Sequence, residues 1–153
     1  MMNDWPNMFA EARIVIVTTN RCTVPRSSMM FVCPTPSLIR TALAEEPRSR
    51  FTLFYGNRDS ASIIFLDALA ELKDRYLSRF ELYHFLAEEE GEVELFNGML
   101  DQKMCGNAIE QLVGDAGGVD AWFICGPGPM MDAAEAALLE RGVAKDRIHI
   151  ERF

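Results

Sequence analysis

The sequence lacks the short motifs that mark several large classes of nucleotide-binding and hydrolytic proteins. No G-x-G-x-x-G follows an expected strand, and neither G-x-x-x-x-G-K-[ST] nor G-x-S-x-G occurs. A standard dinucleotide-binding turn, a P-loop and a serine-hydrolase elbow are therefore not indicated. The cysteines include no C-x-x-C pair, so the sequence gives no support for a zinc or iron–sulfur site. We expect reduced thiols in a cytoplasmic protein.

Positive charge and long apolar runs are also scarce. Lys and Arg number 15 against 23 Asp and Glu, for a formal net charge of -8, so a broad nucleic-acid surface is not expected. No apolar run approaches the roughly 18 residues that span a bilayer. The start, Met1–Pro6, lacks the basic and then apolar order of a signal peptide. We expect neither nucleic acid nor a membrane as a partner.

What the sequence does contain is an alternation of strand-like and helix-like segments. Apolar runs predict strands at 29–33, 51–55, 81–86, 119–125 and 147–150. Helical spacing and composition predict helices at 37–46, 60–76, 101–113 and 130–141, the second capped by Asp59 or Ser60. This order favours an α/β fold, namely a three-layer doubly wound parallel sheet of about five strands.

The first part of the chain does not follow this alternation. We interpret residues 1–28 as an irregular or non-native lead-in, and residues 29–153 as one domain. Within the lead-in, the apolar run at 13–18 is a candidate for an additional edge strand.

Two candidate site segments follow expected strands. Tyr55-Gly56-Asn57-Arg58 ends one strand just before a helix, where a guanidinium could hold a phosphate; the alternative is a solvated loop residue. Cys125 ends another strand, at the sheet edge where open α/β folds bind ligands. It is either a nucleophile with His84 as its base or a small thiol that lines this edge. The acidic run 88–90 is expected to be a solvated loop.

Two longer patterns carry a family resemblance. Phe123-Ile124-Cys125-Gly126-Pro127-Gly128-Pro129-Met130-Met131 is followed by Gly142-Val143 and by Arg147-Ile148-His149-Ile150-Glu151-Arg152-Phe153; Phe54–Arg58 precedes Ser62-Ile63-Ile64-Phe65. Together these patterns resemble the C-terminal nicotinamide-nucleotide domain of ferredoxin–NADP⁺ reductase-like flavoproteins. Within that family they are most similar to the reductase subunits of phenylacetyl-CoA epoxidases. The resemblance covers about residues 37–153.

The resemblance implies hydride transfer from NADPH (or NADH) to FAD, and electron transfer on to an oxygenase of phenylacetate degradation. It implies that Cys125, Glu151 and Phe153 lie near the reacting rings, and that Gly126 and Pro127 shape the turn beside the nicotinamide. Arg58 would meet the adenosine 2′-phosphate, bordered by Tyr55, Gly56 and Asn57. The implied cofactor-binding set is completed by Thr35, Pro36, Ser62 and Met130.

The sequence departs from the family pattern at two places. The pyrophosphate-binding Gly-x-Gly-x-Thr-Pro turn is replaced by residues 29–36, Met-Met-Phe-Val-Cys-Pro-Thr-Pro, whose side chains would push the backbone away from a pyrophosphate. Neither a flavin-binding barrel nor an iron–sulfur domain is found in the sequence. We therefore expect one module of a larger reductase, with flavin-binding and iron–sulfur domains or oxygenase subunits as partners. The alternative is a protein-interaction domain that has lost its cofactor site.

Overall fold

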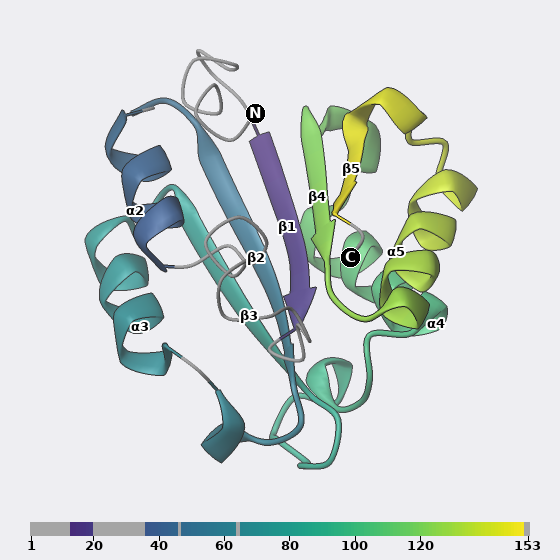
Figure 1. The fold of residues 1–153 in the computed structure, drawn as a ribbon, viewed down its shortest axis with the longest axis horizontal. Helices are drawn as coiled ribbons and strands as arrows, with labels where there is room; N and C mark the ends of the chain where they lie inside the picture. Colours follow the sequence, from purple (N-terminus) through teal and green to yellow (C-terminus); the bar gives the residue numbers. More distant parts are fainter. Residues whose placement is uncertain (1–12, 20–35, 46, 64, 152–153) are drawn as a thin grey trace.

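The computed structural model describes residues 13–19, 36–45, 47–63 and 65–151. Their strands form one parallel sheet in the order β3-β2-β1-β4-β5 (Figure 1). The strands are β1 (Arg13–Thr19), β2 (Arg50–Asn57), β3 (Phe80–Leu86), β4 (Ala121–Cys125) and β5 (Ile148–Glu151). The α/β class and the parallel sheet predicted from the sequence are confirmed.

Strand β1 lies at the centre of this sheet, between β2 and β4. The prediction that residues 13–18 form an edge strand is therefore wrong in its position. A continuous apolar run suits a strand inside a parallel sheet, and β1 pairs with a strand on each side. The strand predicted at 29–33 lies outside the described residues, and the division of the chain at residue 28 stays a prediction.

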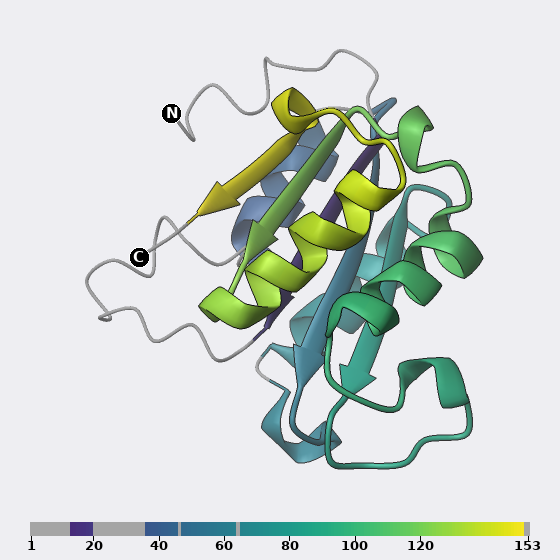
Figure 2. The same ribbon diagram turned by 90° about the vertical axis from the view of Figure 1, so that its right-hand side faces the viewer.

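Helices cover both faces of the sheet, as Figures 1 and 2 show. Helices α2 (Pro36–Glu45) and α3 (Leu66–Arg75) lie on one face, and α4 (Gln102–Ala108) and α5 (Gly128–Glu140) on the other. Alternate residues of β2 serve two cores, because Phe51 and Leu53 pack with the first helix pair and Phe54 with the second. Strand β2 is thus buried on both faces of the sheet.

The segment between β2 and α3 differs from its prediction. One helix was expected from residue 60, capped by Asp59 or Ser60. Instead, a 3₁₀ turn spans Ser60–Ser62 and α3 begins at Leu66. Ser60 does not cap α3, because its hydroxyl donates to Glu89 across the sheet edge. Phe65 takes the N-cap position with a left-handed φ of 64°, and no side chain caps it.

The other helices follow their predicted boundaries more closely than α3 does. Asp101 caps α4 by accepting a hydrogen bond from the Met104 N–H at 2.7 Å. The helix continues as a π-helical turn, Ile109–Val113, which completes the predicted span 101–113. None of the described helices is long and apolar enough to cross a membrane.

Candidate functional site

One row of residues crosses the sheet near the carboxyl ends of its strands. Thr18 at the centre pairs with Tyr55 on one side and Cys125 on the other. His84 pairs with Tyr55, and Glu151 pairs with Cys125. Because all strands are parallel, the predicted site residues Tyr55, Cys125 and Glu151 lie level at the same edge, although the sequence separates them widely. This edge is where open α/β sheets bind ligands.

Cys125 and Arg58 lie at this edge on opposite sides of β1. Arg58 follows the last residue of β2, and Cys125 is the last residue of β4. Two strand spacings of about 4.8 Å and three residue rises of about 3.3 Å place their Cα atoms about 14 Å apart. An extended dinucleotide is long enough to span this separation, so one ligand can reach both residues.

A tight turn follows Cys125. Gly126 and Pro127 link β4 to α5, whose first turn is closed by the hydrogen bond from the Met131 N–H to the Pro127 carbonyl at 3.0 Å. Cys125 itself is buried. Met130 is also buried, in the core that contains Trp122, so its contacts are those of a packing residue and its place in a cofactor site stays a prediction.

The same register rules out a nucleophile–base pair of Cys125 and His84. Two strands separate β3 from β4, so about 14 Å lies between the two residues at about 4.8 Å per strand. A catalytic base must lie within hydrogen-bond reach of its nucleophile, about 3 Å. The hydrolase alternative is therefore wrong.

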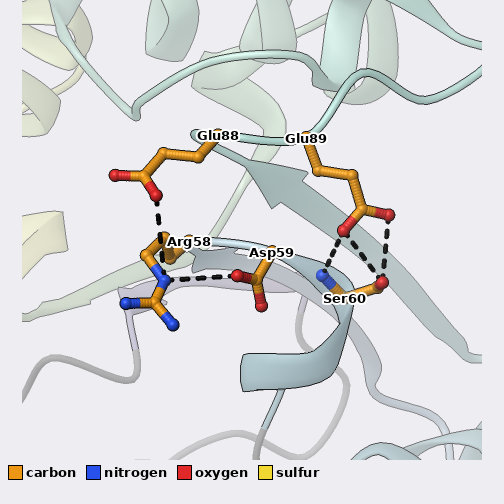
Figure 3. A network of polar contacts seen from close by, with 5 residues as sticks. All are labelled: Arg58, Asp59, Ser60, Glu88 and Glu89. Atoms are coloured by element: carbon orange, nitrogen blue, oxygen red, sulfur yellow. Dashed lines mark hydrogen bonds and ion pairs between the residues drawn. The ribbon is translucent and has the colours of Figure 1, made fainter.

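Arg58 lies in a network of polar contacts at the end of β2 (Figure 3). Its side chain is 52% exposed, and its Nε lies 3.2 Å from Asp59 Oδ2 and 3.8 Å from Glu88 Oε2. Next to it, the Ser60 N–H and hydroxyl donate to the carboxylate of Glu89 at 2.8 and 2.9 Å. The guanidinium is thus accessible to a ligand, but carboxylates surround it.

Sequence reasoning missed the part that Glu88 and Glu89 take in this network. The run 88–90 was predicted as a solvated loop, whereas Glu88 and Glu89 contact residues 58–60. The only available signal was that this run follows one strand as Arg58 follows another. The two loops meet because β2 and β3 are adjacent, and this adjacency cannot be predicted from either segment alone.

Asn57 adds a second polar group at this end of β2. It is 5% exposed, and neither its Nδ2 nor its Oδ1 finds a hydrogen-bond partner among the described residues. An unpaired buried amide is costly. The place of Asn57 in a cofactor site stays a prediction. Tyr55 and Gly56, beside Asn57 in β2, are buried as well.

The remaining predicted site residues are described only in part. The backbone places Pro36 at the first position of α2, Ser62 in the 3₁₀ turn, and Glu151 beside Cys125. Thr35 and Phe153 lie outside the described residues. The roles of all these residues stay predictions.

His84 is a half-buried side chain at the other end of the row. Burial, and secondarily the positive charge of Lys73, lower its pKa from the ordinary value of 6.5. Its Nδ1 has no hydrogen-bond partner among the described residues, and its ring lies 6.1 Å from that of Tyr55. Protonation of His84 would therefore place a positive charge in a partly desolvated position near Lys73.

This burial predicts a pH dependence of stability. Below pH 6.5, His84 is protonated in the unfolded chain but not yet in the folded chain, because its pKa is lowered by folding. The free energy of unfolding therefore falls as the pH drops toward the lowered pKa. In His84→Asn that part of the decrease should vanish when urea unfolding is compared between pH 7 and pH 5. His149→Asn, the control, should keep it. An identical pH profile for wild type and His84→Asn would contradict the prediction.

The fold is that of an open α/β domain, a class whose sheets bind ligands at this edge. The sequence profile of the oxidoreductase NAD-binding domain matches residues 32–136, and the chain belongs to this family. The recognition of a ferredoxin reductase-like nucleotide domain from the sequence is confirmed.

Curated relatives narrow the comparison. The chain is 41% identical over 122 residues to a subunit of the 1,2-phenylacetyl-CoA epoxidase of Escherichia coli, a match that covers 80% of this chain and 34% of the relative. It is 37% identical over 122 residues to the ferredoxin reductase component of 3-ketosteroid-9-alpha-monooxygenase of Mycolicibacterium smegmatis, covering 80% and 31%. The chain thus spans about a third of the length of these relatives.

A solved structure supports the fold. The cytochrome P450 reductase of Amycolatopsis superposes with a TM-score of 0.70 at 23% identity, covering 97% of this chain and 39% of the other. At this identity the likeness concerns the fold alone. The comparisons give no support to the alternative of a protein-interaction domain.

Proposed function

We propose that this chain is the NAD(P)H-binding module of a reductase that passes hydride to FAD and electrons on to an oxygenase. The observation that carries the proposal is the shared edge: a buried thiol at the end of β4 and an accessible guanidinium beyond β2, about 14 Å apart by strand spacing. The family match and two relatives named as oxygenase-system components support it.

Different residues at this edge would bind the two ends of the dinucleotide. Cys125 would adjoin the nicotinamide, and the short Gly126-Pro127 turn would let the ring approach the backbone. At the other end, Arg58 would hold the adenosine 2′-phosphate and the Asn57 amide would pair with polar atoms of the adenosine. When bound, the nicotinamide supplies the hydride and the flavin of the complete reductase accepts it.

The finer parts of the proposal concern the complete reductase. Glu151 and Phe153 would lie at the junction with the flavin, Thr35 and Pro36 at the pyrophosphate, and Ser62 and Met130 at the rim of the site. The flavin-binding and iron–sulfur parts would come from domains or subunits outside this chain. The similarity to a phenylacetyl-CoA epoxidase component favours an oxygenase of phenylacetate degradation as the electron acceptor.

Titration calorimetry of the chain with NADPH, NADH and 2′,5′-ADP tests the proposal. We expect weak binding, because the glycine turn is replaced, and negligible reduction of added FAD, because no acceptor is positioned for the hydride. Inosine, which has neither phosphate nor the adenine amino group, is the control and should not bind. Absence of heat with all three nucleotides would overturn the proposed function.

A further inference from the structure

The loop that follows β3 is hydrogen-bonded to the end of β2. The Ala87 N–H donates to the Asn57 carbonyl at 2.9 Å, and the Glu88 N–H donates to the Arg58 carbonyl at 2.8 Å. These bonds extend the β2–β3 ladder by two residues beyond β3. The side chains of residues 88 and 89 are thereby carried to the same place as those of residues 58–60 (Figure 3).

The far side of this loop is fastened as well. The Gly91 N–H donates to Asn97 Oδ1 at 2.8 Å, and Asn97 Nδ2 donates to the Gly91 carbonyl at 3.2 Å. The Gly98 N–H returns to the Leu86 carbonyl at 2.8 Å. Backbone and side-chain bonds thus hold both ends of the acidic loop, so its carboxylates have a defined position relative to Arg58.

From this position, Glu89 accepts hydrogen bonds from both the backbone N–H and the hydroxyl of Ser60. Its Oε2 accepts from the Ser60 N–H at 2.8 Å, and both carboxylate oxygens accept from the Ser60 hydroxyl at 2.9 Å. Ser60 lies two residues after Arg58 in the sequence. Backbone N–H groups and hydroxyls such as those of Ser60 are donors that phosphate oxygens use. A carboxylate of the protein itself takes them instead.

The local charge points the same way. The five residues of Figure 3 carry one positive charge, on Arg58, and three negative charges, on Asp59, Glu88 and Glu89. A phosphate that reached Arg58 would stand within a Debye length, about 8 Å at physiological salt, of Asp59 and Glu88, and beside Ser60, which binds the Glu89 carboxylate. A ribose hydroxyl would meet no such repulsion, and a carboxylate can accept its proton in a hydrogen bond.

We propose that Glu89 is a specificity-determining residue that disfavours a 2′-phosphorylated adenosine and so shifts the preference of this chain toward NADH. Arg58 attracts the phosphate, whereas Glu89 repels it and occupies the Ser60 donors that would otherwise assist. The inference rests on the proposed function, because it assumes that the adenosine end of a dinucleotide lies beside Arg58. It adds which residue sets the choice between the two dinucleotides.

The test compares the affinities for 2′,5′-ADP and 5′-AMP, which differ by the 2′-phosphate. Glu89→Ala should raise the ratio of the 2′,5′-ADP affinity to the 5′-AMP affinity about five- to tenfold at low salt, and less in 0.5 M salt. Glu89→Gln, which keeps the shape of the side chain, should raise it in the same direction. Glu90→Ala is the matched control, since it removes the same charge from the next, exposed residue.

The outcomes separate the inference from the proposed function. An unchanged ratio in both Glu89 variants, or an equal rise in Glu90→Ala, would overturn the inference while binding itself upheld the proposed function. Absence of binding of either nucleotide to wild type and variants alike would overturn the proposed function and the inference with it. Circular dichroism melting of each variant shows that the compared proteins are folded.

Discussion

Trp122→Ala should lower the free energy of unfolding by about 3–5 kcal/mol, the usual cost of truncating a large buried aromatic residue. Trp122 is 0% exposed in β4, within the core that α5 covers. Its removal leaves a cavity between the sheet and α5 that neither element can close without moving. Urea unfolding followed by circular dichroism measures the change.

Two further variants make this result specific. Trp122→Phe should cost clearly less than alanine, because it keeps an aromatic ring and removes an indole N–H that lacks a partner among the described residues. Leu77→Ala, at a side chain that is 70% exposed, should change the stability by less than about 0.5 kcal/mol. A loss below about 1 kcal/mol for Trp122→Ala would contradict the placement of β4 in the core.

Arg58→Ala should weaken the binding of 2′,5′-ADP by about tenfold or more, the value of a charge-assisted hydrogen-bonded contact of about 1.5–3 kcal/mol. Binding of 5′-AMP, which lacks the 2′-phosphate, should change little. The fold should tolerate the substitution, because exposed ion pairs such as those of Arg58 with Asp59 and Glu88 contribute less than about 1 kcal/mol. Titration calorimetry at low salt measures both affinities.

Arg75→Ala is the matched control for this experiment. Arg75 is similarly exposed and forms one ion pair with Glu71 on α3, so its removal changes the net charge equally without touching the end of β2. Equal losses in the two variants would assign the effect to overall charge. A loss that is the same for 5′-AMP and 2′,5′-ADP would remove Arg58 from the 2′-phosphate.

The elements that the sequence predicted well are those whose burial is written into a single segment. The run 51–55 is rich in strand-forming residues, and it became the middle of β2, which is buried on both faces. The small-residue helix after the Gly-Pro pairs became α5. In both cases local composition and tertiary packing favour the same secondary structure.

The features that it predicted poorly depend on neighbours that are distant in sequence. The place of β1 at the centre follows from pairing with both β2 and β4, and a run at 13–18 does not encode its partners. Serine is a common helix-capping residue, but the Ser60 hydroxyl donates instead to Glu89, which lies in the loop after β3. For the candidate site, the strand ends with Arg58 and Cys125 could be predicted, whereas the acidic contacts of Arg58 could not.

The central position of β1 also constrains how the molecule folds. Strand β1 is the first described strand of the chain, yet one of its two neighbours, β4, begins only at Ala121. The ladder between them joins residues near opposite ends of the sequence, so a long loop must close before its hydrogen bonds form. During synthesis β2 emerges before β4, so β1 can pair with β2 while its other edge still lacks a partner.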